Sequence, residues 1–293
     1  MLQDTLQHVL EYLDWLEKDQ HLQIYLRPNE KYIGRLDSRL MRYNCHVNPY
    51  CLLLKQNRDL WETCIRGQEK VCQKCAQGEF FGMCHAGVEE FVYPLGPDYR
   101  EKGFLSVSGY RLHPEKAQER IRTVSREYHL DAAAVEKMYR QYLNDTPPEK
   151  SQLDRWIHPL CDMLDLLFRQ MDERDSSSDP GNNDLYDSVM RYLWFHYAED
   201  ISLQDLCEKF HCSPSSLSHL FKKRNGKSIR SHLNFLRMQE AAALLQGTDL
   251  PVQNIAALVG IPDGNYFSNL FRKEYGTSPM EWRALRRTGE REP

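Results

Sequence analysis

The spacing of apolar residues predicts a mixed α/β front half and an almost wholly helical back half. Residues 3–18 carry leucine and valine at helical spacing on one side, which predicts an amphipathic helix. The next stretch has no single period, but 87–95 and 103–109 are rich in Val, Phe, Tyr and Leu and predict two strands around a loop. From 114 to 171 the pattern is helical, with a break near 145–148.

The last helix of this stretch has apolar residues spaced alternately by four and three positions. This spacing is typical of a coiled-coil seam, and a helix packed on its own domain gives the same pattern. Because the helix is long and leads directly into a linker, we expect a dimer seam. The seam residues are Leu153, Ile157, Leu160, Leu164, Leu167 and Met171.

Residues 173–184 predict a linker. They are rich in Ser, Asp, Pro, Gly and Asn and contain no large apolar residue. Such residues favour turns or coil and cannot fill a core. We therefore place the main domain boundary here.

The back half, residues 185–287, contains an internal repeat. Each copy has an apolar helix, a short turn and a second helix that ends in Leu-Phe followed by basic residues. The apolar positions are Leu203, Leu206, Cys207, Phe210, Leu217, Leu220 and Phe221 in the first copy, and Val252, Ile255, Ala256, Val259, Phe267, Leu270 and Phe271 in the second.

Capping residues predict where the helices of the repeat begin. Ser202, with Asp205 three residues later, resembles a capping box. Ser213 before Pro214 is typical of an N-cap, and Asp263 is the equivalent residue of the second copy. A helix, a short turn and a capped second helix form a helix-turn-helix. Two such copies favour a nucleic-acid reader over a plain helical bundle.

The charge distribution supports this interpretation, although the whole chain has a net charge of −4. Residues 209–287 hold 12 Lys and Arg against 5 Asp and Glu, whereas residues 1–183 hold 24 against 29. The basic surplus lies where the two copies end, and cations there can neutralise DNA phosphates. We expect phosphate contacts from Lys222, Lys223, Arg272 and Lys273.

Residues 185–287 resemble the AraC/XylS-type DNA-binding domain. The resemblance rests on 213–223 (SPSSLSHLFKK), 233–238 (LNFLRM), Ala241 and Ala242, 265–273 (NYFSNLFRK) and 276–279 (GTSP). Cys207 and His211 stand where the family usually has Ala and Gly. The resemblance implies that both second helices read base edges, to which Asn, Ser and His side chains can bond. The implied base contacts are Ser215, Ser218, His219, Asn265, Ser268 and Asn269.

Six of the nine cysteines fall between Cys45 and Cys84. Cys72 and Cys75 have the spacing of a metal knuckle, in which two thiolates bind one ion. A second pair at this spacing is missing, so Cys64 with Cys84 or His85 has to complete a set for zinc or an iron–sulfur cluster. The alternatives are small buried apolar residues or a redox pair.

The same region, from about residue 6 to residue 170, is similar to the PocR-type sensory domain. The resemblance rests on Asn48-Pro49-Tyr50-Cys51, Cys64, Cys72, Cys75, the string Cys84-His85-Ala86-Gly87-Val88-Glu89-Glu90-Phe91, Pro94, Leu95 and residues 103–109. Residues 20–45 depart from the family pattern. The resemblance implies a variant of the PAS fold that senses small hydrocarbon derivatives such as diols. The ligand or metal candidates are Cys51, Cys64, Cys72, Cys75, Cys84, His85 and Glu89.

We therefore predict an α+β chain in four parts. These are a PAS-like sensory core in 1–113, a helical extension with the dimer helix in 114–172, the linker in 173–184, and an all-α domain with two helix-turn-helix motifs in 185–287. The predicted function is a one-component transcription regulator that binds specific DNA and responds to a small ligand. Expected partners are double-stranded promoter DNA, a small-molecule effector, a second copy of the chain and RNA polymerase. We expect a cytoplasmic location, since no secretory signal or membrane span is evident.

The cysteines suggest two alternative functions. The cluster can sense metal or redox state. Alternatively, a zinc thiolate accepts a methyl group, as in DNA-alkylation repair proteins that join a four-cysteine zinc domain to an AraC-type reader. Cys72-x-x-Cys75 resembles the last cysteine pair of those proteins, but their Arg-Pro-flanked first pair is missing. No hydrolase serine motif, P-loop or dinucleotide fingerprint occurs, so we expect no enzyme.

Overall fold

The structure is a computed structural model that describes residues 2–29, 32, 36–44, 46, 48–97, 99–175, 181–247 and 250–288. Its contacts divide the chain into an N-terminal unit, which lies within residues 1–178, and a C-terminal unit, which lies within 179–293. The predicted linker 173–184 is too long, because helix continues to Asp175 and resumes at Gly181. The middle of that linker, 176–180, lies outside the described residues.

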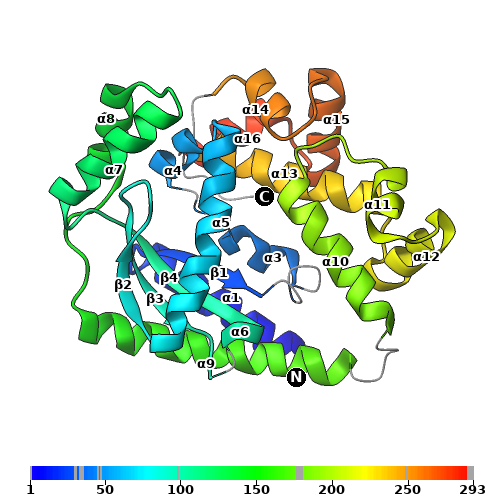
Figure 1. Ribbon diagram of the computed structural model, residues 1–293, viewed down its shortest axis with the longest axis horizontal. Helices are drawn as coiled ribbons and strands as arrows, with labels where there is room; N and C mark the ends of the chain where they lie inside the picture. The colour runs from blue at the N-terminus through cyan, green and yellow to red at the C-terminus, as the bar shows by residue number, and fades with distance from the viewer. Residues whose placement is uncertain are drawn as a thin grey trace. The chain divides into compact units, whose positions relative to one another are not determined.

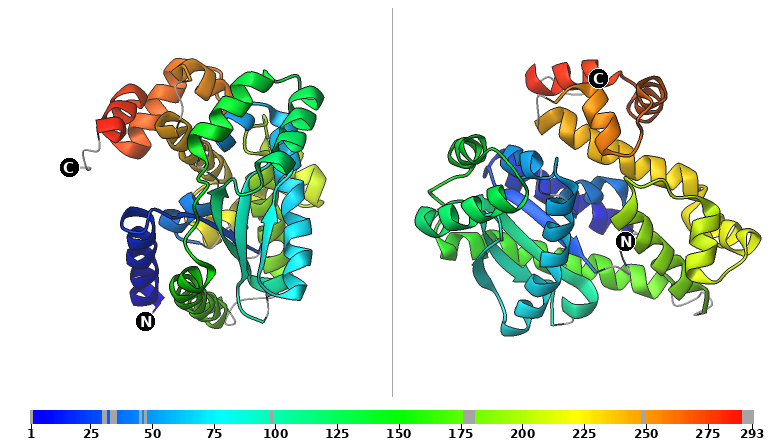
Figure 2. Two further views of the ribbon diagram at one scale, coloured as in Figure 1. Left: turned by 90° about the vertical axis from the view of Figure 1, so that its left-hand side faces the viewer. Right: turned by 45° about the horizontal axis from the view of Figure 1, so that its top comes forward.

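The N-terminal unit is a four-stranded sheet with helices on both faces (Figures 1 and 2). Its strands are β1 (Gln23–Pro28), β2 (Phe80–Met83), β3 (Glu89–Pro94) and β4 (Gly103–Tyr110). Its α-helices are α1 (Leu2–Lys18), α3 (Ser38–Met41), α4 (Pro49–Leu54), α5 (Arg58–Lys74), α6 (Tyr99–Lys102), α7 (Pro114–Glu127), α8 (Ala132–Tyr142) and α9 (Lys150–Asp175). The described residues of this unit also form the 3₁₀ turns η1 (Arg42–Asn44) and η2 (Cys75–Gln77).

The sheet is antiparallel, with the strand order β1-β4-β3-β2. β4 lies between β1 and β3 and is buried along its whole length, including its two serines, Ser106 and Ser108. The strands predicted in 87–95 and 103–109 are confirmed as β3 and β4, while β1 and β2 were not predicted. A small antiparallel sheet within a mostly helical fold is established, and the PAS-like assignment stays a prediction.

One face of the sheet is covered by α1 and α9 (Figure 2, left). The predicted helix over 3–18 is confirmed as α1, which buries Val9, Leu13 and Leu16. Tyr12 Oη donates to the carbonyl of Trp156 at 3.1 Å and so joins α1 to α9. This packing closes the main core of the N-terminal unit.

The apolar face of α9 belongs to this core, and the predicted dimer seam is therefore wrong. Each of its six residues is at most 9 % exposed, and all six belong to one buried cluster with residues of α1, β3 and β4. The heptad-like spacing arose because a helix packed on its own unit needs the same apolar stripe. The helical extension 114–172 is accordingly part of the N-terminal unit and not a separate lever. The residues concerned are Leu153, Ile157, Leu160, Leu164, Leu167 and Met171.

The other face of the sheet packs against α5 and η2 (Figure 2, left). Tyr25, Val92 and Phe104 point to this side and contact Cys75. A further apolar cluster joins α4, α7 and α8 to the turn after β2, where Tyr50 Oη donates to the carbonyl of Ala86 at 2.7 Å. This second face mixes apolar and polar side chains, unlike the face under α9.

The C-terminal unit is all helical (Figure 1). Its helices are α10 (Gly181–His196), α11 (Leu203–Phe210), α12 (Pro214–Asn225), α13 (Ile229–Gly247), α14 (Val252–Leu258), α15 (Gly264–Tyr275) and α16 (Pro279–Thr288). α13 is the central element, because it packs on α10, on α12 of the first copy, and on α14 and α15 of the second. Within the described ranges, no helix is both long and apolar enough to cross a membrane.

Candidate nucleic-acid interface and ligand pocket

The first helix-turn-helix is formed by α11 and α12. Ser202 and Asp205 make a reciprocal capping box, with backbone-to-side-chain bonds of 2.8 and 3.1 Å. Ser213 Oγ accepts the amide of Ser216 at 3.2 Å, directly before Pro214 at the first helical position. The predicted caps of this copy are confirmed, and they fix where α12 begins.

The second helix-turn-helix is formed by α14 and α15. Asp263 Oδ1 accepts the amides of Asn265 and Tyr266 at 2.9 and 3.0 Å, as the sequence predicts. The turn before it contains Gly260 in a left-handed conformation, with φ at +80°. Both second helices therefore start at a capped residue, and both end at a left-handed glycine.

The side chains predicted to read bases lie on the second helices, opposite their buried faces. α12 buries Leu217, Leu220 and Phe221, and α15 buries Phe267 and Phe271. Ser268 is an exception, since it is half-buried and its Oγ donates to the carbonyl of Gly264 at 2.8 Å. The fully exposed members of the predicted set are Ser215, Ser218, His219, Asn265 and Asn269.

The four cations predicted to contact phosphate are all exposed, in the last turns of α12 and α15. Arg272 lies close enough to Glu281 to lower the pKa of that carboxyl, although the hydrogen bond from Ser278 contributes more. Within the part of the chain that the structure describes, Lys222, Lys223 and Lys273 form no ion pair. Their charges are available to a polyanion.

Two residues of the C-terminal unit were not singled out for a role by sequence reasoning. Arg237 of α13 donates to the carbonyls of Tyr197 and Glu199, both at 2.7 Å, and so fixes the central helix to the segment between α10 and α11. Tyr266 is 43 % exposed on α15, and its hydroxyl accepts a bond from Asn234 at 3.2 Å. The sequence signal that pointed to Tyr266 was its position between Asn265 and Asn269, two residues predicted to contact bases.

The cysteines predicted to bind metal are divided between separate packed regions. Cys72 and Cys75 lie under the sheet at the end of α5, whereas Cys51 and Cys84 pack with α4 and α7. Cys64 Sγ lies 3.7 Å from His85 Nε2. Because α5 rises about 12 Å from Cys64 to Cys72, these thiols cannot meet at one ion.

Among the described residues, Glu79, Asp154 and His158 bring one possible metal-ligand atom each to within 4.8 Å of one another. Lys150 Nζ already lies 2.9 Å from Glu79 Oε2 and contacts Asp154. His158 Nε2 lies 2.5 Å from Glu79 Oε1. This group is an ion-pair network that fastens α9 to the segment before β2.

The front thiols behave as small core residues. Burial raises the pKa of Cys75 to about 12 and that of Cys84 to about 11. Burial also raises the pKa of Cys51 and Cys72, with the neighbouring Cys84 adding to the effect at Cys51. These four thiols are protonated at neutral pH, which makes them unreactive.

His85 and Glu89 have structural partners. Burial, followed by the charge of Arg120, lowers the pKa of His85, which lies in the turn between β2 and β3. Glu89 is buried and accepts the amide of His113 at 2.8 Å and that of Leu112, while its other oxygen contacts the His113 ring. Glu89 thus fixes the loop before α7. Its carboxylate is already bonded and is not free to hold a ligand, although Glu89 is one of the ligand candidates predicted from the sequence.

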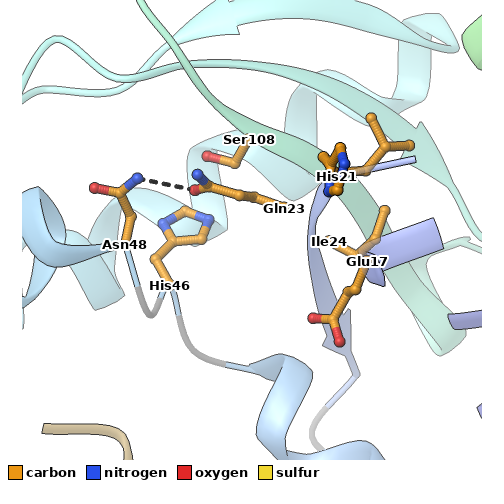
Figure 3. A pocket seen from close by; sticks show the side chains of 8 residues that line it. Glu17, His21, Gln23, Ile24, His46, Asn48 and Ser108 are labelled. Atoms are coloured by element: carbon orange, nitrogen blue, oxygen red, sulfur yellow. Dashed lines mark hydrogen bonds between the residues drawn. The ribbon is translucent and has the colours of Figure 1, made fainter. Parts of the chain in front are cut away.

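A pocket of about 320 Å³ opens instead beside β1, where the sheet has an edge (Figure 3). In this view Asn48 bonds to Gln23, and the His46 ring lies next to them. None of the residues predicted for the sensor site lines this pocket. Its lining residues are Glu17, His21, Leu22, Gln23, Ile24, His46, Asn48 and Ser108.

Comparison with known proteins bears on the C-terminal unit. Residues 206–285 match the family described as helix-turn-helix domain. The chain is 37 % identical over 138 residues to the uncharacterized HTH-type transcriptional regulator YijO of Escherichia coli (strain K12), covering 46 % of this chain and 47 % of YijO. It is 30 % identical over 149 residues to the HTH-type transcriptional activator RhaR of Cronobacter sakazakii (strain ATCC BAA-894), covering 49 % of this chain and 53 % of RhaR.

A solved structure with a related sequence is the C-terminal domain of AraT, a response regulator from Geobacillus stearothermophilus. It is 34 % identical, with 37 % of this chain and 88 % of that chain covered and a TM-score of 0.34. The chain spans about half the length of the curated relatives it matches.

The predicted helix-turn-helix class is confirmed for the C-terminal unit, in which residues 206–285 match the helix-turn-helix domain family. The similarity of the chain to transcriptional regulators such as RhaR agrees with the AraC-type resemblance of this unit. Both matched relatives are regulators of transcription by name, in agreement with the class expected from the sequence. The PocR-like assignment of the N-terminal unit stays a prediction.

Proposed function

We propose that this protein is a one-component transcription regulator. The observation that carries the proposal is the pair of capped recognition helices, α12 and α15, whose exposed polar faces end in exposed cations. Exposed Ser, His and Asn side chains can bond to base edges, while Lys and Arg at the helix ends can hold phosphates. Sequence-specific binding to double-stranded DNA follows from this division of roles.

We further propose that the N-terminal unit responds to a small molecule, in line with its resemblance to PocR-type domains. A bound effector changes DNA binding only if its affinity differs between two arrangements of the chain. Pairing of two copies and contact with RNA polymerase rest on the resemblance alone. Because the apolar face of α9 is buried, two copies would have to meet through another surface.

A metal or redox sensor is the second candidate function, and the cysteines give it little support. The protonated thiols of Cys51 and Cys84 and those of Cys72 and Cys75 lie in different packed clusters. A zinc thiolate that accepts methyl groups needs a complete ligand set at one place. We therefore favour an organic effector.

The DNA proposal is tested with duplexes selected by the full-length protein from a random-sequence pool. Fluorescence anisotropy then gives the Kd at several salt concentrations. For the double variant Lys222→Ala/Lys223→Ala, the slope of log K against log salt should fall by about 2, since each phosphate contact contributes about 0.9. Asn269→Ala should lose about 1–3 kcal/mol of discrimination while binding to random DNA is unchanged.

Lys116→Ala/Lys137→Ala is the matched control, because it removes the same charge from exposed positions of the N-terminal unit. This control should leave the salt slope unchanged. Equal slopes for the two double variants, or affinity that does not depend on salt, would contradict the proposed interface.

A further inference from the structure

The pocket beside β1 has a polar lining without a strong positive charge. None of its eight residues is Lys or Arg. Burial, with a smaller contribution from Lys55, lowers the pKa of His46 to about 3, so that this ring is neutral at physiological pH. The carboxylate of Glu17 already accepts a hydrogen bond from Tyr43 Oη at 3.0 Å. An anionic ligand lacks a cation here, whereas an uncharged ligand needs none.

One wall of the pocket is held in place by the side chain of Asn48. Its Nδ2 donates to Gln23 Oε1 at 3.0 Å and to the carbonyl of Tyr142 at 2.9 Å, while its Oδ1 accepts the amide of Tyr50 at 2.9 Å. These bonds fix Asn48 and orient Gln23 (Figure 3). A wall fixed in this way is preorganised for binding.

Three lining groups keep hydrogen-bonding capacity that the protein does not use. Among the described residues, the Nε2 amide of Gln23, the hydroxyl of Ser108 and the His46 ring have no hydrogen-bond partner. Gln23 and Ser108 are paired across β1 and β4, so they lie side by side on the sheet. A ligand hydroxyl can both donate and accept, and it therefore suits all three groups.

His46 connects the pocket to a carboxyl in the interior of the unit. Its side chain is 27 % exposed, but Nε2 is buried, lacks a hydrogen-bond partner and lies 3.7 Å from Glu90 Oε2. Glu90 is buried on β3, where it accepts a bond from Ser106 of β4 at 2.7 Å. The separation of 3.7 Å is too long for a hydrogen bond and short enough to become one after a small movement of the ring.

We propose that this pocket binds the effector, an uncharged small polyol, through Gln23, Ser108 and His46. The inference rests on the proposed function, since it assigns the effector site of the regulator. A volume of about 320 Å³ lies at the lower end of ligand pockets and sets the size of the molecule. Four of the eight lining residues, those from His21 to Ile24, lie within residues 20–45, the part of the chain that departs from the PocR pattern.

The effector acts on the His46 tautomer. A ligand hydroxyl that donates to Nδ1 leaves the ring proton on Nε2, which faces Glu90. The ring can then donate to the carboxyl and satisfy an atom that is otherwise buried without a partner. Occupancy of the pocket is thereby transmitted to β3 and β4. His46 is a positioning residue in this scheme, and Glu90 is its acceptor.

Binding is tested by calorimetry and thermal unfolding of the full-length protein with glycerol, xylitol and xylose, and with gluconate and putrescine as charged probes. At least one polyol should bind saturably and raise the Tm by several degrees. Ser108→Ala should weaken this binding at least tenfold. Ser125→Ala is the matched control, because it removes another buried serine hydroxyl of the same unit outside the pocket.

The tautomer step has its own readout. Nitrogen NMR of the imidazoles, assigned with His46→Gln, should show that the ligand moves His46 to the form protonated on Nε2. Glu90→Gln should keep the ligand site but reduce this shift. A structural role of His46 alone would leave the tautomer unchanged on binding.

Several results would overturn the proposal. They are the absence of saturable binding by any of the polyols, preferential binding of gluconate or putrescine, and equal losses in Ser108→Ala and Ser125→Ala. A non-saturable rise in Tm shared by all variants is the general effect of osmolytes and also counts against a site. Since calorimetry uses no DNA and the anisotropy assay no polyol, failure of the pocket and failure of DNA binding are distinguishable.

Discussion

The two helix-turn-helix copies share one backbone plan but place different residues at the same point of the turn. In each copy an amide after the turn bonds back to the first helix, from Cys212 to Cys207 at 3.1 Å and from Ile261 to Ala256 at 2.8 Å. The residue before that amide is left-handed in both copies, His211 with φ at +52° and Gly260 with φ at +80°. The plan therefore requires a left-handed residue, whatever the sequence supplies.

The surroundings of the two left-handed residues differ. His211 is exposed, whereas a Cβ added to Gly260 would lie 2.4 Å from the carbonyl oxygen of Ala198. The second turn packs against the segment between α10 and α11, so only glycine fits there. The first copy tolerates a side chain because its turn is open. The second copy is thus the more constrained of the two.

Among the variants that probe this difference, Gly260→Ala should cause the largest loss of stability. The added methyl group meets backbone and also places alanine at positive φ. We expect a loss of about 2–4 kcal/mol of stability in the C-terminal unit, the sum of overpacking and backbone strain. Hydrogen exchange of the full-length protein measures this, with peptides from the N-terminal unit as an internal reference.

Gly226→Ala and Gly276→Ala are the matched controls for Gly260→Ala. Both glycines are left-handed, with φ at +74° and +76°, but an added Cβ would meet nothing within 4 Å. They should lose only about 1 kcal/mol, the conformational term alone. If all three variants lose the same amount, the contact with Ala198 does not constrain the second turn.

The C-terminal unit was predictable because its signals are local. The capping box at Ser202, the cap at Asp263 and the apolar spacing each fix a boundary within a few residues, and the structure confirms them. The partner of an apolar face is not local information. For this reason the face of α9 from Leu153 to Met171 was assigned to a second copy, although it packs on α1.

The pocket that we propose for the effector could not be predicted for a similar reason. Gln23, His46 and Ser108 come from three separate segments, and no spacing rule joins them before β1 pairs with β4. The cysteines, in contrast, have a recognisable spacing, and the metal site inferred from it does not agree with their positions in two separate clusters. Cys72 and Cys75 fill the space under the sheet, a role that periodicity did not reveal.

Removal of the helix caps should reveal a smaller difference in stability between the two copies. Asp263 accepts two amides, at 2.9 and 3.0 Å, and precedes Gly264, a poor helix former. Ser213 accepts one amide at 3.2 Å and is followed by Pro214, which preorganises the first turn. We expect Asp263→Ala to cost about 1–2 kcal/mol and Ser213→Ala about 0.5–1 kcal/mol.

Urea unfolding of each cap variant measures these losses. Ser215→Ala is the control, since it removes an exposed hydroxyl from α12 outside the cap and should change stability by less than about 0.5 kcal/mol. A larger loss of stability for Ser213→Ala than for Asp263→Ala would contradict this order. It would show that neither the number of cap bonds nor the proline after Ser213 determines how much each cap contributes.

His211→Gly should change the stability least, and it should raise the stability where the other variants lower it. The left-handed conformation disfavours a residue with a Cβ, and glycine removes this strain while it adds freedom to the unfolded chain. We expect a net gain of about 0.5–1 kcal/mol in urea unfolding. His211→Ala separates the causes, because it removes the imidazole but keeps the Cβ and should give no gain. If the two variants behave alike, the first turn is not strained, and the copies differ only in the packing of Gly260 on Ala198.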